Sequence, residues 1–306
     1  MRPRSLILGT CMAVVLLLAG CASHTRPATV RMSNASLKTA NKTELVARVN
    51  TEAAQIQTLN ATVDIKAAIG GSKKGKITEY QEVRGYILAR KPGWLRMIGL
   101  MPVLRNRAFD MVSDGSTFKL WIPPKNRFVV GTNELSKPSK QPLENLRPQH
   151  IYDALLLHPI DANSDIAVLE QGFATITDEQ GKNTTIQPEY VLDVIQKDNQ
   201  GWVLTRKIYF DRTDLQPYRQ VVYDHNGYIA TDARYDDFKN YNGIEFPSHI
   251  SIWRPQEEYS VTMSIEKLTI NAQLTDDQFV LAQPPGAQVV HLGPQTESQA
   301  RGPQPE

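Results

Sequence analysis

The chain has 306 residues, with 34 Lys and Arg against 32 Asp and Glu, and its two cysteines are Cys11 and Cys21. This length can bury a sizeable core, and the near-balanced charge gives no electrostatic argument for binding nucleic acid or an anionic membrane surface. Beyond Cys21 the sequence contains no thiol for a disulfide, a metal site or nucleophilic catalysis.

The N-terminal segment has the order of a secretory signal peptide. Arg2 and Arg4 are followed by the apolar run Leu6–Leu18 and then by Leu18-Ala19-Gly20-Cys21. The apolar run is too short for a comfortable membrane-spanning helix. We therefore predict that residues 1–20 are cleaved as a signal peptide. An ordinary signal peptide with a cysteine placed there by chance is the alternative.

The four residues that end this segment resemble the bacterial lipobox, in which the cysteine is acylated and becomes the first residue. The resemblance implies lipidation at Cys21 and a membrane-anchored protein. In such lipoproteins an Asp after the cysteine usually means retention at the inner membrane, and Ala22 stands there instead. We therefore expect an outer-membrane location, with the protein facing the periplasm.

Polar, small residues at 22–41 predict a flexible tether that follows the lipidated cysteine, so that residues 21–41 form one segment. The Pro-, Gln- and Gly-rich residues 291–306 predict a disordered tail. Between them, residues 42–290 show no linker and no clear repeat, which indicates one domain. A helix is predicted over residues 43–59, with Asn41 or Thr43 as its N-cap.

The remainder reads mainly as β-strands joined by short turns. Asn226-Gly227 lies between two Tyr-containing runs and is a strong hairpin signal. A second helix is predicted over residues 146–157, with Pro148 in its first turn and Pro159 after its end. Strands are predicted near residues 62–69, 77–90, 93–99, 106–113, 116–122, 126–130, 173–178, 188–198, 202–211, 217–224, 228–238, 246–254 and 259–269.

The predicted fold is α+β and mostly β, with about 11–12 strands in one antiparallel sheet. Short helices would cover the mouth of this open barrel as a lid. Tyr190, Leu192 and Val194 alternate with the apolar residues Val191 and Ile195, so both faces of that strand are apolar. A sheet curved around an apolar cavity explains this pattern, and so does a filled barrel or sandwich core.

No catalytic constellation is recognisable. Gly70–Lys76 nearly spells a phosphate-binding loop, but Ile77 occupies the Ser or Thr position and a strand follows, so we interpret it as a mobile hairpin turn. The six histidines show no metal-ligand spacing, and the adjacent acidic pairs point to opposite faces of a strand. We predict no enzyme activity, no metal and no cofactor.

One turn is unexpectedly apolar. Leu100, Met101, Val103 and Leu104 surround Pro102 between two predicted strands, where a polar loop is the norm. Exposing side chains of this size costs about 1.5–3 kcal/mol each relative to burial. Either the loop folds back onto the core, or it contacts acyl chains or dips into a bilayer.

The run Trp94-Leu95-Arg96-Met97-Ile98, this loop and Phe109–Gly115 together resemble LolB-type lipoprotein receptors. The strand at Thr62–Ile69 and the helix at Leu146–His158 fall in matching order, and Phe279–Val289 is similar to the end of the related carrier LolA. The similarity covers most of residues 43–290 as pattern and order, without a diagnostic motif.

This resemblance implies an open, strongly curved half-barrel whose apolar interior accepts acyl chains of lipoproteins from a soluble LolA-like carrier. It also implies that the apolar loop helps to insert them in the membrane, although Val103 stands where the family tends to have Leu. We expect a monomer; the alternative is a structural or interaction lipoprotein with a filled interior. The candidate cavity residues are Trp94, Met97, Phe109, Met111, Phe118 and Trp121.

Overall fold

The computed structural model describes residues 30–33, 35–133, 147–177, 184–199 and 201–292. The predicted lipidation site at Cys21, the predicted signal peptide and almost all of the predicted tail lie outside these ranges. Contacts divide the chain into two compact units. One holds the described residues up to Ala35 with Phe173–Pro188, and the other holds Ser36–Gly172 with the described residues from Glu189 onward.

The described residues form sixteen strands and two α-helices, so the predicted mostly-β class is confirmed with more strands than expected. The elements are β1 (Val30–Met32), α2 (Lys42–Gln55), β2 (Thr58–Gly71), β3 (Lys76–Glu79), β4 (Val83–Arg90), β5 (Trp94–Leu100), β6 (Arg107–Ser113), β7 (Thr117–Ile122), β8 (Arg127–Thr132), α3 (Pro148–Leu155), β9 (Asp165–Thr177), β10 (Thr184–Asp198), β11 (Gly201–Asp211), β12 (Pro217–Tyr223), β13 (Ile229–Tyr241), β14 (Ile244–Arg254), β15 (Tyr259–Ile270) and β16 (Gln288–Leu292), with single 3₁₀ turns at Pro123–Lys125 and Asp276–Phe279.

In the smaller unit, β1 pairs in parallel with the start of β10 through Val30–Met32 and Thr184–Ile186. The backbone N–H of Ser33 continues the ladder by donating to the carbonyl of Ile186 at 2.9 Å. Part of the segment predicted as a tether is therefore a strand in the structure.

In the larger unit the sheet runs in the order β10-β11-β12-β13-β14-β15-β2-β4-β5-β6-β7-β8-β16, and β3 pairs with β2. Its pairs are antiparallel except for β8 with β16. The predicted Asn226-Gly227 hairpin joins β12 to β13. Gly227 has φ +80°, a conformation that favours glycine, and its N–H donates to the carbonyl of Asp224.

Helix α2 begins within one residue of its predicted start and ends at Gln55, before the predicted end at residue 59. Asn41 and Glu44 form a reciprocal capping box at its start. At its end Ile56 is already extended, and the N–H of Gln57 donates to the side chain of Asn271 at 2.8 Å. The chain therefore enters β2 at Thr58, within the predicted helix, because a tertiary contact from the distant β15 end overrides the local periodicity.

Two strand predictions also differ from the structure. The predicted strand at 77–90 is two strands, interrupted at residues 80–82, and the strand predicted at 173–178 begins at Asp165 as β9. Its first half carries acidic and amide residues at 165, 170 and 171, which weaken the strand signal. Helix α3 is shorter than predicted, with Pro148 in its first turn as expected.

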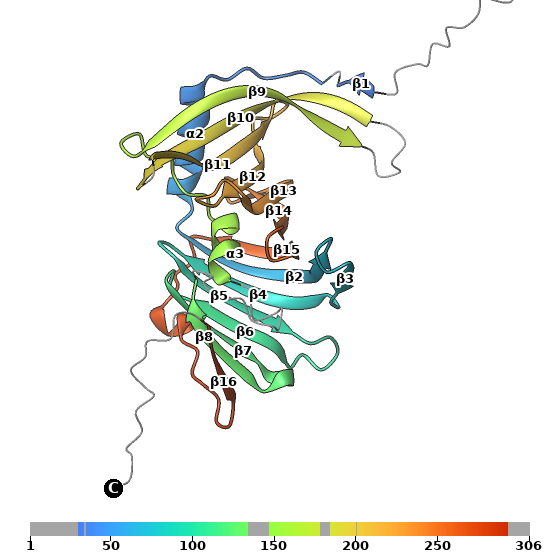
Figure 1. The fold of residues 1–306 in the computed structure, drawn as a ribbon, viewed down its shortest axis with the longest axis vertical. Coiled ribbons are helices and arrows are strands. Elements are labelled where there is room, and N and C mark those ends of the chain that lie inside the picture. Colours follow the sequence, from blue (N-terminus) through green and yellow to red (C-terminus); the bar gives the residue numbers. More distant parts are fainter. Residues whose placement is uncertain (1–29, 34, 134–146, 178–183, 200, 293–306) are drawn as a thin grey trace, which may run out of the picture. The chain divides into compact units, whose positions relative to one another are not determined.

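The sheet of the larger unit curves around α3. The amide of Gln220 on β12 donates to the carbonyl of Asp153 in α3 at 3.4 Å, and the Arg147 guanidinium at the start of α3 lies 4.9 Å from the Phe118 ring on β7. Eight strand spacings separate β12 from β7, which is about 38 Å in a flat sheet, whereas an eight-residue helix is about 12 Å long. The sheet is therefore strongly curved, and α3 lies on its concave face (Figure 1).

Register places one continuous set of residues on this concave face, since paired residues point to the same side. At the β10–β11 end the set packs against Leu45 and Val49 of α2. In the centre it packs against Ile151, Tyr152 and Leu155 of α3. Representative members are Leu192, Ile208, Gln220, Ala233, Ile252, Val261, Ala67, Ile65, Ile87, Met97, Met111, Leu120 and Val129.

The opposite face of β5–β7 is covered by the C-terminal segment. Phe279 packs edge-on against Trp94, and Leu281 packs with Val112 and Phe128. Asp110 is fully buried and accepts two hydrogen bonds from the Arg96 guanidinium, at 3.1 and 2.9 Å. Arg96 also donates to the carbonyl of Gln278 at 2.8 Å, which ties this segment to the sheet.

We expect Asp110→Ala to lower the free energy of unfolding by about 3 kcal/mol, because it leaves the Arg96 charge without its buried partner. Asp64→Ala is the matched control. It removes a similar cross-strand pair with Arg84 that is exposed to solvent and screened by it, so the loss should be clearly smaller. Urea unfolding followed by circular dichroism measures both, and equal losses would contradict the structural role of Asp110.

Candidate functional site

An apolar cavity of about 290 Å³ lies on the concave face, between the sheet and α3. Its volume is at the lower end of the range for small-molecule sites. Its walls are almost entirely hydrocarbon, so it offers dispersion contacts and dry surface to an apolar ligand. The lining residues are Ile65, Ala67, Tyr80, Gln81, Val83, Met97, Met101, Pro102, Ala108, Phe109, Met111, Leu120, Ile122, Ile151 and Val261.

The structure divides the cavity residues predicted from the sequence into two groups. Met97, Phe109 and Met111 line the cavity. Phe118 lies on the same face, in the core beneath Arg147.

Trp94 and Trp121 lie elsewhere, on the opposite face of the sheet under the C-terminal segment. They alternate with the inward residues Leu95 and Leu120, so period-2 spacing alone would have separated the two groups.

The residues of the apolar loop between β5 and β6 also fall into two groups. Leu100 is half-buried at the end of β5, and Met101 and Pro102 line the cavity. Val103 and Leu104 point away from it, with 96% and 70% of their surfaces exposed. The loop closes through backbone hydrogen bonds between Met101 and Asn106 at 2.7 Å and between Arg105 and Met101 at 3.0 Å. It therefore connects the cavity wall to an exposed apolar tip.

The backbone at the tip is in a conformation that β-branched residues avoid. Val103 has φ 68° and Arg105 has φ 52°, both in the left-handed region. Such a residue costs on the order of 1–3 kcal/mol and persists where surrounding structure holds it. A strained valine that is also fully exposed contributes little to stability, which points to a role outside the core.

A second, polar chamber of about 530 Å³ lies on the other side of α3, against β12–β14. Its lining includes His150, Asp153, Gln220, Thr231 and Arg254. Burial and the nearby Arg254 and Arg147 guanidinium groups hold the pKa of His150 well below its usual value, so this imidazole is neutral at neutral pH. Gln220, Thr231 and Arg254 occupy concave-face positions where the neighbouring strands have apolar residues.

Sequence reasoning missed this chamber. Gln220 and Thr231 are polar and each stands next to a charged residue, Arg219 or Asp232, and Arg254 ends a strand, so each reads as exposed. In the structure Arg254 is buried, and it donates to the Thr231 hydroxyl and the Glu257 carboxylate, each at 2.7 Å. Only the register across β12, β13 and β14 shows that the three residues share the buried face.

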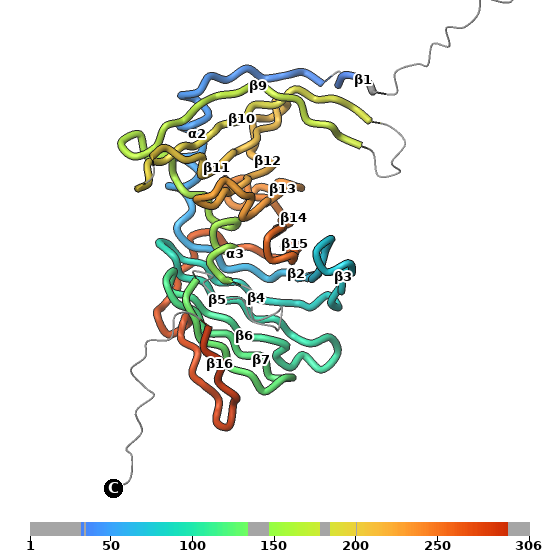
Figure 2. Tube along the Cα trace, viewed as in Figure 1, coloured from blue at the N-terminus to red at the C-terminus, as the bar shows by residue number. Residues whose placement is uncertain are grey.

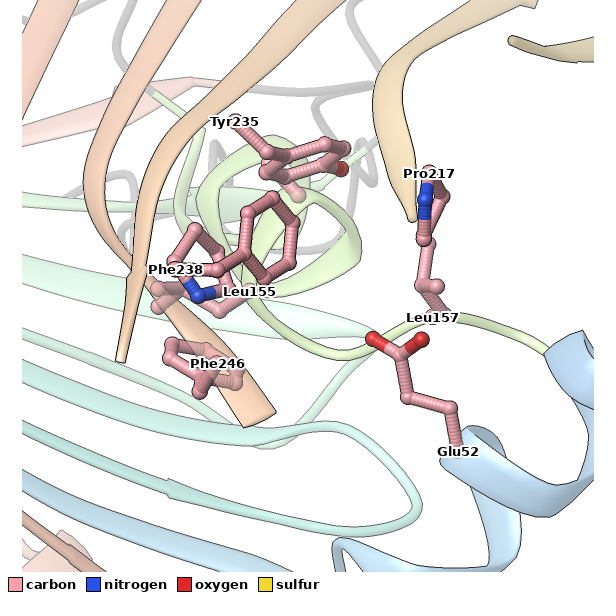
Figure 3. Close-up of a pocket in the computed structure, with 9 residues that line it drawn as sticks. Glu52, Leu155, Leu157, Pro217, Tyr235, Phe238 and Phe246 are labelled. Atoms are coloured by element: carbon pink, nitrogen blue, oxygen red, sulfur yellow. The ribbon is translucent and has the colours of Figure 1, made fainter. Parts of the chain in front are cut away.

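A third, very small pocket of about 10 Å³ lies where α2 ends, too small for a ligand larger than about one water molecule. Figure 3 shows the Glu52 carboxylate facing this pocket, near Leu157 and Pro217. Burial raises the pKa of Glu52 to about 7, although the nearby Arg48 and Lys91 cations oppose the shift. This carboxyl group therefore changes charge close to neutral pH.

Other site types are not seen in the part of the chain that the structure describes. No three His, Cys, Asp or Glu side chains gather there as metal ligands. None of its helices has the length and hydrophobicity needed to span a bilayer.

No family model matches the sequence, and no curated protein matches it significantly. Among solved structures, the chain is similar to a LolA superfamily protein from Nitrosomonas europaea, with 13% identity and a TM-score of 0.47 over 79% of this chain and 99% of that one. It is also similar to a putative outer membrane lipoprotein-sorting protein domain from Vibrio parahaemolyticus, with 14% identity and a TM-score of 0.45 over 78% and 97%.

A DUF1329 family protein from Desulfovibrio piger is similar as well, with 13% identity and a TM-score of 0.48 over 78% and 95% of the two chains. The first of these structures is named as a LolA superfamily protein, the group that the sequence resembles. A likeness at this level concerns the fold and does not establish an activity.

We expect Glu52→Gln to stabilise the protein in a pH-dependent way. The folded-state pKa is raised, so the folded protein holds this proton more tightly than the unfolded chain, and ionisation costs stability as the pH rises from about 4.5 to about 7. The variant should gain about 1–2 kcal/mol over the wild type at pH 8 and nothing at pH 4.

Thermal unfolding at both pH values measures this difference, with Glu82→Gln at an exposed position as the control. A gain that is independent of pH would show that the Glu52 charge is not the cause.

Proposed function

We propose that this chain is a non-enzymatic lipoprotein of the bacterial outer membrane that binds an acyl chain in the 290 Å³ cavity and delivers it to a membrane through the Val103-Leu104 tip. The observation that supports it is the continuity of one loop. Met101 and Pro102 form part of the cavity wall, and the next two residues are exposed. A bound acyl chain and a bilayer would therefore contact adjacent residues of this loop.

The cavity volume limits the ligand. A dry cavity of 150 Å³ holds benzene, so 290 Å³ corresponds to roughly a dozen carbon atoms. One acyl chain fits this estimate, and a second would require α3 to move away from the sheet. Each buried methylene contributes about 0.8 kcal/mol, which makes a single chain a substantial ligand without any polar contact.

The sequence supports the proposed cargo and location. The lipobox-like Leu18–Cys21 supports an acyl anchor on Cys21, and Ala22 supports the outer membrane, facing the periplasm. The resemblance of residues 94–115 to LolB-type receptors supports lipoproteins as cargo and a soluble LolA-like carrier as donor, with this chain acting as a monomer.

A second candidate function is a structural or interaction lipoprotein of the envelope. One observation favours it, namely that Ile151, Tyr152 and Leu155 of α3 fill the centre of the concave face. In that case the remaining cavity is a packing defect and no lipid co-purifies with the protein. Mass spectrometry of lipids extracted from natively purified protein separates the two functions.

We expect Ala67→Phe to weaken binding of a fluorescent fatty acid at least tenfold, because the new ring occupies the cavity that Ala67 lines. Thr262→Phe on the neighbouring strand is the control, since Thr262 pairs with Lys66 and points to the opposite face. Fluorescence titration should give one site per wild-type protein. Folded wild-type protein that binds no probe, or two variants that bind equally, would contradict the proposal.

We expect the double variant Val103→Ser, Leu104→Ser to fold and bind the fatty-acid probe like the wild type, because both side chains are exposed. Transfer of an acylated lipoprotein to vesicles should fall at least tenfold, since an apolar contact with the bilayer is lost. Leu100→Ser, Met101→Ser is the comparison and should impair probe binding as well, because Met101 lines the cavity. Normal transfer by the first variant would exclude the tip as the delivery element.

A further inference from the structure

We infer that the end of the sheet carrying the Val103-Leu104 tip is a docking surface for anionic phospholipid bilayers, with the lysine-rich β2–β3 hairpin as its second contact. This inference rests on the proposed function, in which the same tip meets a membrane. It adds a selectivity for lipid charge and assigns a role to Gly70–Lys76, which resembles a phosphate-binding loop but forms a hairpin.

The hairpin and the loop lie at the same end of the larger unit. Strands β2 and β5 run in the same direction on either side of β4, so the turns after Gly71 and after Leu100 lie at the same end of the sheet (Figure 2). Two strand spacings, about 10 Å, separate the two strands across the sheet, and β2 continues to Gly71 beyond Asp64, the residue that Arg84 aligns with Leu100. Tyr80 and Gln81, which follow the hairpin, line the same cavity as Met101 and Pro102. The chain that leaves the hairpin therefore borders the same cavity as the apolar loop.

Exposed apolar side chains and cations occur together at this end. Besides Val103 and Leu104, Ile77 on β3 has 66% of its surface exposed. The exposed cations are Lys73, Lys74, Lys76, Arg105 and Arg107. Apolar side chains within a group of Lys and Arg are typical of surfaces that lie in a membrane interface and bind anionic lipids.

Nearby carboxylates do not cancel this charge. Glu79 already pairs with Lys66 at 3.3 Å, and Glu258 is buried and accepts a hydrogen bond from the backbone N–H of Lys73 at 2.5 Å. Asp110 is shared between the Arg96 and Arg107 guanidinium groups. Glu82 is the remaining exposed acid between the two turns, so the local charge is positive although the charge of the whole chain is nearly balanced.

The hairpin is held in a defined position. Besides the contact from Lys73, the N–H of Gly70 donates to the carbonyl of Glu258 at 2.7 Å. Gly70 has φ +116°, and a Cβ there would lie 2.0 Å from the carbonyl oxygen of Lys76, so only glycine fits. The lysines are therefore presented at a fixed place beside the tip.

The test uses vesicle co-sedimentation of a chain that starts at Ala22, which keeps every residue that the structure describes and lacks the acylated cysteine. Vesicles of phosphatidylcholine alone are compared with vesicles that also contain phosphatidylglycerol. We expect tighter binding to the anionic vesicles that weakens as salt is raised, since exposed charges are screened. The triple variant Lys73→Ser, Lys74→Ser, Lys76→Ser should bind them 10- to 100-fold more weakly.

The matched control removes the same charge elsewhere, by Lys42→Ser, Lys239→Ser, Lys267→Ser. These lysines are exposed and lie at the start of α2 and near the ends of β13 and β15, away from the two turns. The control should retain binding within about twofold, a bound that leaves room for long-range screening effects. Equal binding to neutral and anionic vesicles, or an equal loss in both triple variants, would overturn the inference.

Fatty-acid binding by the hairpin variant separates this inference from the proposed function. Unchanged probe binding with weakened vesicle binding supports the docking surface. Normal anionic-vesicle binding by a protein that binds no fatty acid would refute the acyl-binding function and leave the docking surface in place.

Discussion

Burial of one continuous sheet face is the constraint on which the structure depends. From β10 to β8 the inward residues form one continuous face that is apolar except for a polar sector on β11–β14, and two short helices are available to cover it. A flat sheet of this width would leave most of that surface wet, so curvature around α3 is the way to bury it. Because a curved sheet and one eight-residue helix do not match in size, space remains on both sides of α3. Both cavities follow from this mismatch.

The sequence predicts what depends on local periodicity. The capping box at Asn41, the Asn226-Gly227 hairpin, most strands and three of the six cavity residues follow from it. It does not show what depends on distant partners. The end of α2 is set by Asn271, and Trp94 and Trp121 are buried by a C-terminal segment on the far face. Buried polar residues such as Gln220 and Arg254 look exposed until the register of three strands is known.

The division of the concave face into apolar and polar sectors has an electrostatic reason. Arg206 is buried on this face and donates to the carbonyl of His158 at 2.8 Å, so the chain after α3 is fixed by a buried cation. Arg147, at the start of α3, lies over the Phe118 ring, and Arg254 donates to the Thr231 hydroxyl and the Glu257 carboxylate. Unpaired charges in a low-dielectric interior are costly, so these cations are satisfied by carbonyl, hydroxyl and carboxylate groups or stacked on an aromatic ring. The polar sector anchors α3 and leaves the apolar sector free of charge.

The proposed acyl carrier would need little energy to release its ligand. Roughly a dozen buried carbons are worth about 10 kcal/mol relative to water, but a bilayer offers nearly the same gain per methylene. Transfer is therefore close to balanced if water is kept from the chain during the exchange. Contact between the protein and the bilayer then decides the rate of transfer, because it removes the step in which the acyl chain crosses water. The placement of the cavity wall at Met101-Pro102, the tip at Val103-Leu104 and the basic hairpin matters for this reason, since all three lie at one end of the sheet.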